Sequence, residues 1–505
     1  MASLNAFRLP GKSKKERKLS INKRMQTQKK RTSILTITLV ASLGGFLFGF
    51  DMAVISGVLP FLQKQFSLSA FEEGWFVSSA LIGCIIGVAF SGEASDRLGR
   101  KKPLLLSAIF FCLSAAGCAF MPSLFWIVVF RFIGGVGIGL ASNVVPLYIS
   151  EIAPAKSRGR LITYYQFALT LGILAAYLSN AGLVSYATAH PASGDAGPFN
   201  FIFSQEVWRG MLFLGVVPAI LFLMGLYLVP ESPRWLMQRG RIEEGRAVLA
   251  RISADKEFQQ EVIPVKESEN ISYKELFSTR WRKALLIGML LPLFSQFSGI
   301  NAIIYYGPSI LSNAGISLSN SLLSQVIFGL ANMIFTLIAI WKVDSAGRRP
   351  LYLFGTAGAA LSLAFTGACF ASGATASIWL LVCVLAFLAC FAFSIGPLKF
   401  VVAAEIFPAK IRGRAMAISI MVMWIADTIV GQLTPVLLKN IGTAATFWTF
   451  AAFCVIAFLT VYKLLPETKG KSLEQIEAEW SGQGFVDGTE VNKEPAPEKV
   501  KIFHP

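Results

Sequence analysis

The sequence carries one segment twice: Glu151-Ile-Ala-Pro-Ala-Lys-Ser-Arg-Gly-Arg160 returns as Glu405-Ile-Phe-Pro-Ala-Lys-Ile-Arg-Gly-Arg414, 254 residues further along. A second segment, Asp96-Arg-Leu-Gly-Arg-Lys101, returns in a related form as Asp344-Ser-Ala-Gly-Arg-Arg349. A third, Pro230-Glu231-Ser232, returns as Pro466-Glu467-Thr468. Three pairs in the same order indicate that the chain is built from two matched halves.

The composition places these halves in a membrane. Of the 505 residues, 54% are hydrophobic and only 15% are charged, against roughly 25% charged residues in a soluble domain. So few charges cannot coat the surface of a water-soluble protein of this length. Lipid must therefore solvate most of the exterior.

A membrane-spanning helix needs about 20 mostly apolar residues, and the chain offers twelve such stretches. They lie at 33–63, 72–94, 103–121, 123–150, 158–182, 209–229, 282–312, 320–342, 350–372, 376–404, 411–438 and 444–465. We predict an all-α membrane protein with twelve transmembrane helices in two six-helix repeats and a short cytoplasmic helical linker. The expected parts are a basic arm (1–32), two bundles (33–230 and 282–465), the linker (231–281) and a tail (466–505).

The basic residues orient the chain in the bilayer. All but five of the 46 Lys and Arg residues fall on one side of the predicted spans, and such an excess marks the cytoplasmic side. Both termini are therefore expected in the cytoplasm. The net charge of +17 is explained by topology, so we expect the lipid bilayer and no nucleic acid as a partner.

Several classes of function are disfavoured. The sequence has no complete phosphate-binding loop, because Gly11-Lys12-Ser13 and Gly470-Lys471-Ser472 lack the first glycine of that motif. The seven cysteines lie in apolar stretches without a Cys-x-x-Cys pair. We expect no enzymatic activity, no cofactor and no metal. Two parallel six-span repeats are an architecture of secondary transporters.

The motifs resemble those of the sugar porter family of the major facilitator superfamily. They include Arg131-x-x-x-Gly135-x-Gly137-x-Gly139, Pro230-Glu231-Ser232-Pro233-Arg234, and Gln296-x-x-x-x-Asn301-x-x-x-Tyr305-Tyr306. The resemblance covers about residues 35–480 and is nearest to bacterial xylose-type sugar:proton symporters. It implies alternating access, a monosaccharide (pentose or hexose) and protons as transported partners, a multi-pass protein of a bacterial inner membrane, and a monomer.

Two charged residues inside the spans point to proton coupling. Asp51 lies in the first span and Arg131 in the fourth, at depths that allow them to meet. A charge at that depth costs at least several kcal/mol unless it is paired or neutralised. A carboxylate that alternates between pairing with Arg131 and binding a proton couples proton entry to movement of the halves. The alternative is a static ion pair that holds the two spans together.

A sugar site needs side chains that both donate and accept hydrogen bonds, with an aromatic face against the ring. By the family motifs, the resemblance assigns eight residues to it: Phe48, Gln166, Gln296, Asn301, Tyr305, Asn332, Phe400 and Trp424. For any single amide, a hydrogen bond between helices is the alternative. Ser295 and Met423 depart from the family pattern. Lys399 and Asp427 add charges whose role stays open; by depth we expect that they do not pair and that Lys399 points toward the cytoplasm or Glu405.

Charges at the cytoplasmic helix ends form the predicted gate. By resemblance, salt bridges among them tie the helices together when the protein opens outward. The candidates are Asp96, Arg100, Glu151, Arg160, Glu231, Asp344, Arg348, Glu405, Arg414 and Glu467.

We therefore expect a proton-coupled monosaccharide symporter. A facilitator of the same fold, in which the Asp51–Arg131 pair is structural, is the first alternative. A sugar sensor that binds without transporting is the second.

Overall fold

The computed structural model describes residues 33–190, 197–252, 277, 281–313, 315–374, 378–407 and 412–467. In this part of the chain the regular structure is helical and no strand occurs. Twelve helices among the described residues are long and apolar enough to cross a membrane. They match the twelve predicted stretches one for one.

The helices of the first half are α2 (Ile34–Phe66), α3 (Ala70–Leu98), α4 (Lys101–Phe120), α5 (Leu124–Ile152), α6 (Ala155–Ala189), α7 (Pro198–Asn200), η1 (Phe201–Gln205), α8 (Val207–Phe213) and α9 (Val216–Leu228). Those of the second half are α14 (Arg282–Phe297), α15 (Ile300–Asn313), α16 (Leu318–Ala346), α17 (Arg348–Ala371), α18 (Ile378–Cys390), η2 (Phe391–Ile395), α19 (Gly396–Ile406), α20 (Arg412–Asn440) and α21 (Gly442–Leu464). Pairs such as α8 with α9, and α14 with α15, together make single crossings.

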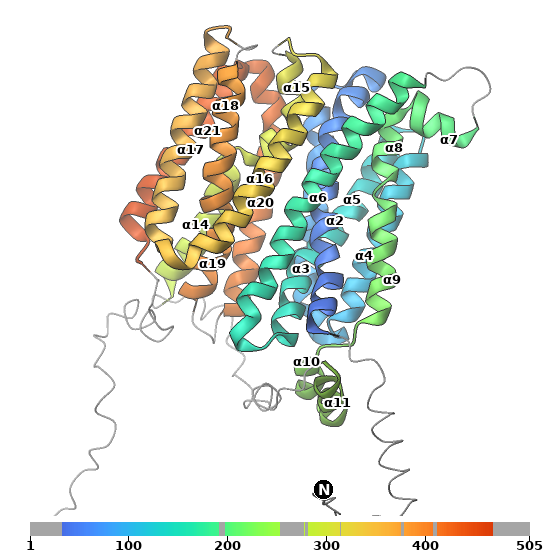
Figure 1. Cartoon of the computed structure of the whole chain (residues 1–505), viewed down its shortest axis with the longest axis vertical. Helices are drawn as coiled ribbons and strands as arrows, with labels where there is room; N and C mark the ends of the chain where they lie inside the picture. Colours follow the sequence, from blue (N-terminus) through green and yellow to red (C-terminus); the bar gives the residue numbers. More distant parts are fainter. Residues whose placement is uncertain are drawn as a thin grey trace, which may run out of the picture.

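The two halves use the same packing scheme. In the first half α2 packs on α6, and α4 packs on α5 and α9; in the second half α14 packs on α20, and α17 packs on α18 and α21. These pairs occupy equivalent positions in the order of crossings, which confirms the two six-helix repeats. The halves meet where α3 contacts α20, α6 contacts α16 and α2 contacts α15, and Figure 1 shows them side by side.

Small residues allow the helices of a half to approach closely. A Cβ atom built on Gly49 of α2 would lie 1.9 Å from the Leu169 carbonyl oxygen of α6, and one on Gly172 would lie 2.1 Å from the Phe46 carbonyl oxygen. Only glycine fits such backbone contacts, and they are typical of helix pairs in membranes.

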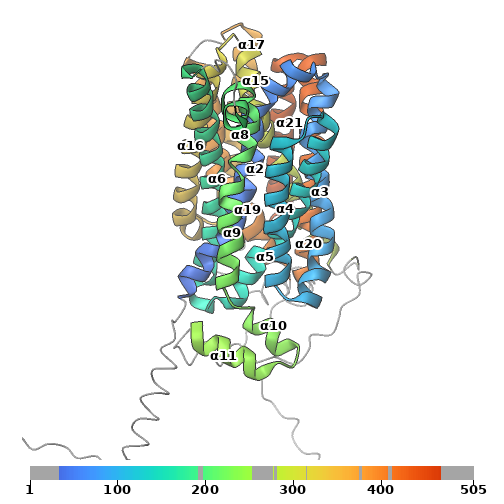
Figure 2. The same cartoon turned by 90° about the vertical axis from the view of Figure 1, so that its right-hand side faces the viewer.

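Two short helices, α10 (Pro233–Gln238) and α11 (Ile242–Ile252), follow the first half. Figure 2 shows them below one end of the bundle, which we call the linker end. Trp235 anchors α10 there, because its indole Nε1 donates to the Asp96 carbonyl oxygen at 2.8 Å. The helices α10 and α11 agree with the predicted helical character of the linker. The basic arm, the rest of the linker except residues 277 and 281, and the tail beyond 467 lie outside the described residues.

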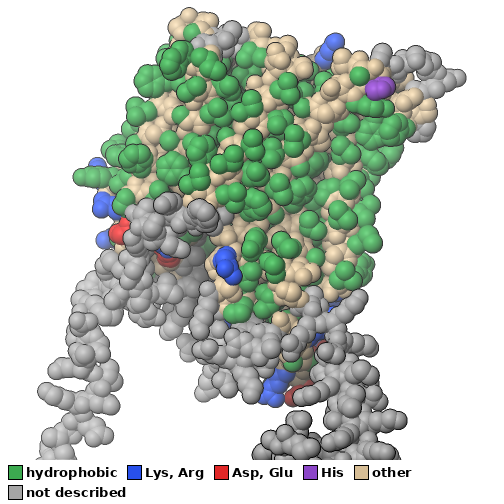
Figure 3. Space-filling view, viewed as in Figure 1, with side chains coloured by type: hydrophobic (Ala, Val, Ile, Leu, Met, Phe, Trp, Pro, Cys, Tyr) green, Lys and Arg blue, Asp and Glu red, His purple; other side chains and the backbone are tan. Residues whose placement is uncertain are grey.

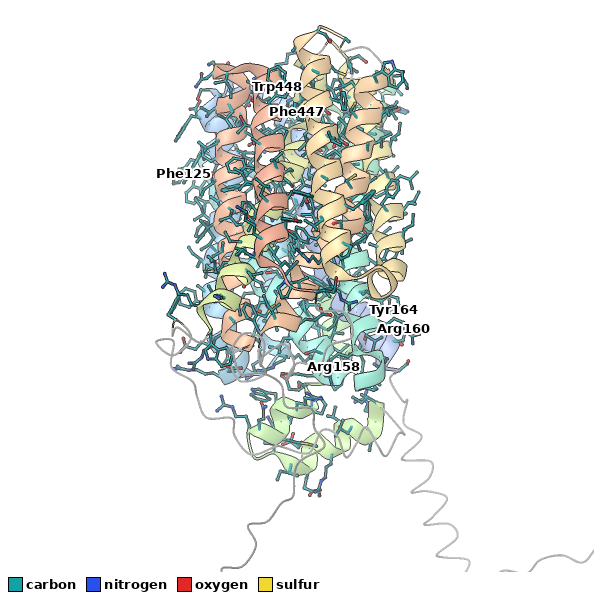
Figure 4. All side chains as sticks on the ribbon, turned by 90° about the vertical axis from the view of Figure 1, so that its left-hand side faces the viewer. Phe125, Arg158, Arg160, Tyr164, Phe447 and Trp448 are labelled. Atoms are coloured by element: carbon teal, nitrogen blue, oxygen red, sulfur yellow. The ribbon has the colours of Figure 1, made fainter. Side chains whose placement is uncertain are left out.

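The exterior of the bundle is apolar. Hydrophobic side chains cover the face in Figure 3, and its Lys, Arg and acidic side chains lie toward the two ends. Phe125 and Trp448, labelled in Figure 4, are 68% and 47% exposed. An apolar band with polar ends is the surface that a bilayer solvates.

Candidate functional site

A cavity of about 110 Å³ lies between the two halves. Its walls come from α2 and α6 of the first half and from α14, α15, α16, η2, α19 and α20 of the second half. Glutamine, asparagine, threonine and charged side chains stand among apolar ones. This mixture can hold a ligand that carries both hydroxyl groups and apolar faces.

Six of the eight residues assigned to the sugar site line this cavity: Phe48, Gln166, Gln296, Asn301, Asn332 and Trp424. Tyr305 is buried behind the wall and is 1% exposed. The side chain of Phe400 lies outside the described residues. The helix that carries Gln296 and Asn301 is broken between them, since α14 ends at Phe297 and Gly299 has φ +83°.

A chain of hydrogen bonds runs along the second-half wall. The Asn301 amide nitrogen donates to Gln296 Oε1 at 2.8 Å and to Asp427 Oδ1 at 2.7 Å. The Tyr305 hydroxyl donates to Asp427 Oδ2 at 3.1 Å. Both hydrogens of the Asn301 amide are therefore used, and its oxygen is left to accept. Asp427 fixes how the two amides are oriented toward the cavity.

An aromatic contact joins the halves across the cavity. The rings of Phe48 and Trp424 lie 5.3 Å apart at a tilt of 45°. The Trp424 indole nitrogen is buried and has no hydrogen-bond partner among the described residues. A buried donor without a partner is costly, and Trp424 is one of the residues that line the cavity.

Lys399 also lies in the cavity wall. Its Nζ donates to the Ser295 hydroxyl at 3.0 Å, and the residue is 8% exposed. The expectation that Lys399 points toward the cytoplasm or Glu405 is therefore wrong. Depth counted along each helix placed Lys399 and Asp427 far apart, yet both line one cavity. The count failed because α20 has 29 residues, about 43 Å at ~1.5 Å per residue, so its first residue does not mark the edge of a bilayer core about 30 Å thick.

Asp51 and Arg131 meet at a second, smaller cavity. Arg131 Nη1 lies 3.7 Å from Asp51 Oδ2, and the two side chains are 2% and 19% exposed. Both of these atoms are buried without a hydrogen-bond partner among the described residues. The Arg131 guanidinium also stands 5.2 Å from the centre of the Phe76 ring. The predicted meeting is confirmed, and the contact is an ion pair without a hydrogen bond.

Helix α2 separates the two cavities. Phe48, Gly49 and Met52 line the central cavity, whereas Asp51 and Val54 line the smaller one. Successive turns of one helix thus contact the ion pair on one face and the central cavity on the other. Movement of α2 changes both cavities together.

At the linker end, Arg100 is the centre of the first-half charges. It donates to Glu151 Oε1 at 2.7 Å and to Asp96 Oδ1 at 3.0 Å. Burial disfavours the charge, but the hydrogen bonds and charge of Glu151 outweigh it and raise the pKa of Arg100. The Glu231 carboxylate accepts from the backbone nitrogens of Arg100 and Lys101 at 2.8 Å and 3.2 Å, at the start of α4, where a negative charge is favourable.

The second half repeats this arrangement. Arg348 lies 2.9 Å from Glu405 Oε1. The Glu467 carboxylate accepts from the backbone nitrogens of Arg348 and Arg349 at 3.0 Å and 3.1 Å. These bonds each join elements of one half.

The remaining gate candidates are Arg160, Arg414 and Asp344, and their part in a gate stays a prediction. Arg160 is exposed at the linker end, as Figure 4 shows, and its side chain has no ionic partner among the described residues. Arg414 is half-buried at the start of α20. The side chain of Asp344 lies outside the described residues.

Two hydrogen bonds between the halves lie toward the end opposite the linker. The Ser78 hydroxyl of α3 donates to Gln432 Oε1 of α20 at 2.6 Å, and Gln432 Nε2 donates to the Phe71 carbonyl oxygen at 3.1 Å. A further contact between the halves, from the Tyr177 hydroxyl of α6 to the Ile304 carbonyl oxygen at 3.4 Å, lies beside the central cavity, which Ile304 lines. The far end of the bundle is therefore fastened across the two halves.

Sequence reasoning missed Thr170 and Thr336, which also line the central cavity. Each stands four residues after an amide that it did find, Gln166 and Asn332. Residues at i and i+4 share one helix face, so this spacing is the signal that would have found them.

Comparison with known proteins agrees with this architecture. The family model described as "Sugar (and other) transporter" matches residues 37–480. The chain is 39% identical over 451 residues to the arabinose-proton symporter of Bacillus subtilis (strain 168), covering 88% of this chain and 95% of that protein. It is 40% identical over 494 residues to the D-xylose-proton symporter of Escherichia coli (strain K12), covering 90% and 97%.

Solved structures give the same result. The proton:xylose symporter XylE bound to 6-bromo-6-deoxy-D-glucose matches with a TM-score of 0.72 and 38% identity, covering 88% of this chain and 99% of that one. The inward open conformation of the xylose transporter XylE from E. coli matches with a TM-score of 0.75 and 38% identity, covering 88% and 100%.

Proposed function

This chain belongs to the family of sugar (and other) transporters, and on that premise we propose that it is a proton-coupled monosaccharide symporter that works by alternating access. It is a multi-pass membrane protein of the major facilitator superfamily, in a family of transporters and not of enzymes. A pentose or hexose is the proposed substrate, because the relatives are named as arabinose and xylose symporters.

The observation that carries the proposal is the ion pair of Asp51 and Arg131 beside α2. A carboxylate 3.7 Å from a guanidinium, without a hydrogen bond, is held by charge attraction alone. Such a pair is weakened as soon as a helix shifts, and the separated carboxylate in an apolar site then binds a proton. Because α2 also lines the central cavity, the position of the substrate and the protonation of Asp51 are linked.

The central cavity supports a sugar as the substrate. Gln166, Gln296, Asn301 and Asn332 supply donors and acceptors for hydroxyl groups, and Phe48 and Trp424 supply aromatic surface. Tyr305 and Phe400 belong to this proposed site by resemblance; Tyr305 acts on it through its hydrogen bond to Asp427.

The charged clusters around Arg100 and Arg348 are the proposed gate at the linker end. In this conformation each cluster joins helices of the same half. The hydrogen bond from Ser78 to Gln432 joins the two halves at the far end. The conformation thus corresponds to a transporter that is closed at the far end. Asp96 already belongs to the Arg100 cluster; when the halves rock, Arg160, Asp344 and Arg414 are the further groups proposed to join the gate.

The excess of Lys and Arg at the linker end supports an orientation with both termini in the cytoplasm. We assign the two bundles to residues 33–230 and 282–465, and we infer that one chain is a complete transport unit, since the central cavity is walled by both of its halves.

Uptake of labelled D-xylose and L-arabinose into liposomes that contain the purified protein tests the proposal. An inward proton gradient should drive the labelled sugar to an internal concentration above the external one. Collapse of the gradient with a protonophore should release the accumulated sugar. Equilibration without accumulation would identify a facilitator. Binding without any flux would identify a sensor.

A further inference from the structure

Two charged side chains lie in the central cavity, and the proton pathway through Asp51 does not use them. Among the described lining residues, Lys399 of α19 and Asp427 of α20 are the only charged ones. They are 8% and 1% exposed. Charges at membrane depth are rare, and they mark substrate or ion pathways.

Accepting on the above grounds that a sugar is the substrate, we propose that Lys399 and Asp427 determine its specificity: Lys399 donates to one hydroxyl group of the sugar, Asp427 accepts from another, and their opposite charges restrict the cavity to neutral sugars.

The geometry supports a direct contact for Asp427. Its carboxylate takes one hydrogen bond from Asn301 and one from Tyr305. A carboxylate offers about four lone-pair positions, so acceptor capacity remains on a side chain that lines the cavity. An ionised acceptor makes hydrogen bonds about twice as strong as a neutral one.

Lys399 supplies the complementary donor. Its ammonium group carries three hydrogens and no acceptor, and the Ser295 hydroxyl takes one of them at 3.0 Å. Ser295 is buried and is not among the residues that line the cavity, so its hydrogen bond positions the Lys399 ammonium group at the wall. A sugar hydroxyl can accept from Lys399 and donate elsewhere.

The two charges also act together. Opposite charges that line one cavity attract each other, and they leave the cavity without net charge. A sugar acid would gain from Lys399 but would be repelled by Asp427, and an amino sugar would meet the reverse. A neutral sugar gains from both, because a hydroxyl group donates and accepts.

The competing explanation is a structural ion pair that only stabilises the second half. A double-mutant cycle separates the two explanations. In a structural pair, each single substitution leaves one charge uncompensated, and removing both restores function. In a recognition pair, each substitution removes a different contact with the sugar, and the losses multiply.

The test measures equilibrium binding of tritiated D-xylose to purified protein in detergent, for the wild type, Lys399→Gln, Asp427→Asn and the double variant. Lys463→Gln, at an exposed position of α21, is the matched control. Each single variant should raise the Kd about 10-fold or more. The double variant should raise the Kd by about the product of the two single fold-changes. Melting temperatures check that each variant is folded, and Lys399→Met and Asp427→Glu replace any variant that is not.

Competing sugars test whether the cavity prefers neutral sugars to charged ones. D-glucuronate and D-glucosamine should displace D-xylose from the wild type at least 10-fold less well than D-glucose does. Recovery of binding in the double variant, or unchanged Kd values in folded single variants, would overturn the inference while leaving transport in place. Stronger competition by D-glucuronate that depends on Lys399 would also overturn it. A wild type that binds none of these sugars would instead contradict the proposed function.

Discussion

Replacement of Asp51 by Asn should abolish gradient-driven accumulation of sugar. In the structure Asp51 Oδ2 and Arg131 Nη1 are 3.7 Å apart, and two unit charges at that distance attract by about 4–5 kcal/mol at an effective dielectric constant of ~20. A free energy of that size shifts the balance between the charged and the protonated carboxyl by about three powers of ten. Separation of the pair is therefore sufficient for the Asp51 carboxylate to bind a proton. The asparagine side chain cannot bind a proton in this way.

The size of the effect follows from the driving force. One elementary charge moving through 100 mV gains about 2.3 kcal/mol, which supports an accumulation of about 50-fold for one proton per sugar. Asp51→Asn should reduce this ratio to 1, while exchange of internal for external sugar continues. The assay uses liposomes with a potassium diffusion potential, and Glu93→Gln, which removes an exposed carboxylate, is the matched control.

Stability must be followed in the same variant, because Arg131 loses its partner at a buried site. Breaking a buried pair costs about 3–5 kcal/mol, so the melting temperature of Asp51→Asn should fall. Continued accumulation by a folded Asp51→Asn protein would refute the reasoning, since the proton would then be carried elsewhere. Loss of exchange together with accumulation would show that the substitution disturbs the sugar site itself.

Three further predictions concern the scaffold. Glu231→Gln removes the charge at the start of α4 and should lower the free energy of unfolding by about 1–2 kcal/mol, read from thermal melts; an unchanged melt would show that this cap is dispensable. Gly49→Val places a side chain where the Cβ alone would lie 1.9 Å from a backbone oxygen of α6, so folded yield should collapse, whereas Gly182→Val, where nothing lies within 4 Å, should be tolerated. Gln432→Ala removes the bond to α3 and should speed labelling of Thr336→Cys by an impermeant thiol reagent from the far side. If Thr336→Cys is labelled at the same rate with and without Gln432→Ala, the bonds of Gln432 do not hold the far end closed.

The sequence predicted the scaffold well, because lipid imposes a simple rule on it. Every spanning segment must be an apolar helix that satisfies its own backbone, so length and hydropathy are enough to find twelve helices. The repeated charged segments fixed the division into halves. Gly299 lies at the break between α14 and α15 and has a positive φ, which glycine adopts readily.

The cavity was harder to predict, since it depends on where helices from different halves come together. Family motifs named Gln296 and Asn301, but not the hydrogen bond that joins Asn301 to Asp427. The position of Lys399 was missed because counting residues along a helix ignores its tilt, its overhang and the reach of a long side chain. That residues of α19 and α20 line the same cavity is tertiary information that no local pattern carries.

Simultaneous recording of sugar uptake and external pH tests the central claim most directly. When sugar is added to an unbuffered suspension of de-energised liposomes or cells that contain the wild-type protein, the medium should become alkaline at the rate of sugar entry, and a protonophore should abolish the pH change but not the entry. Entry of sugar with no change in pH would contradict proton coupling.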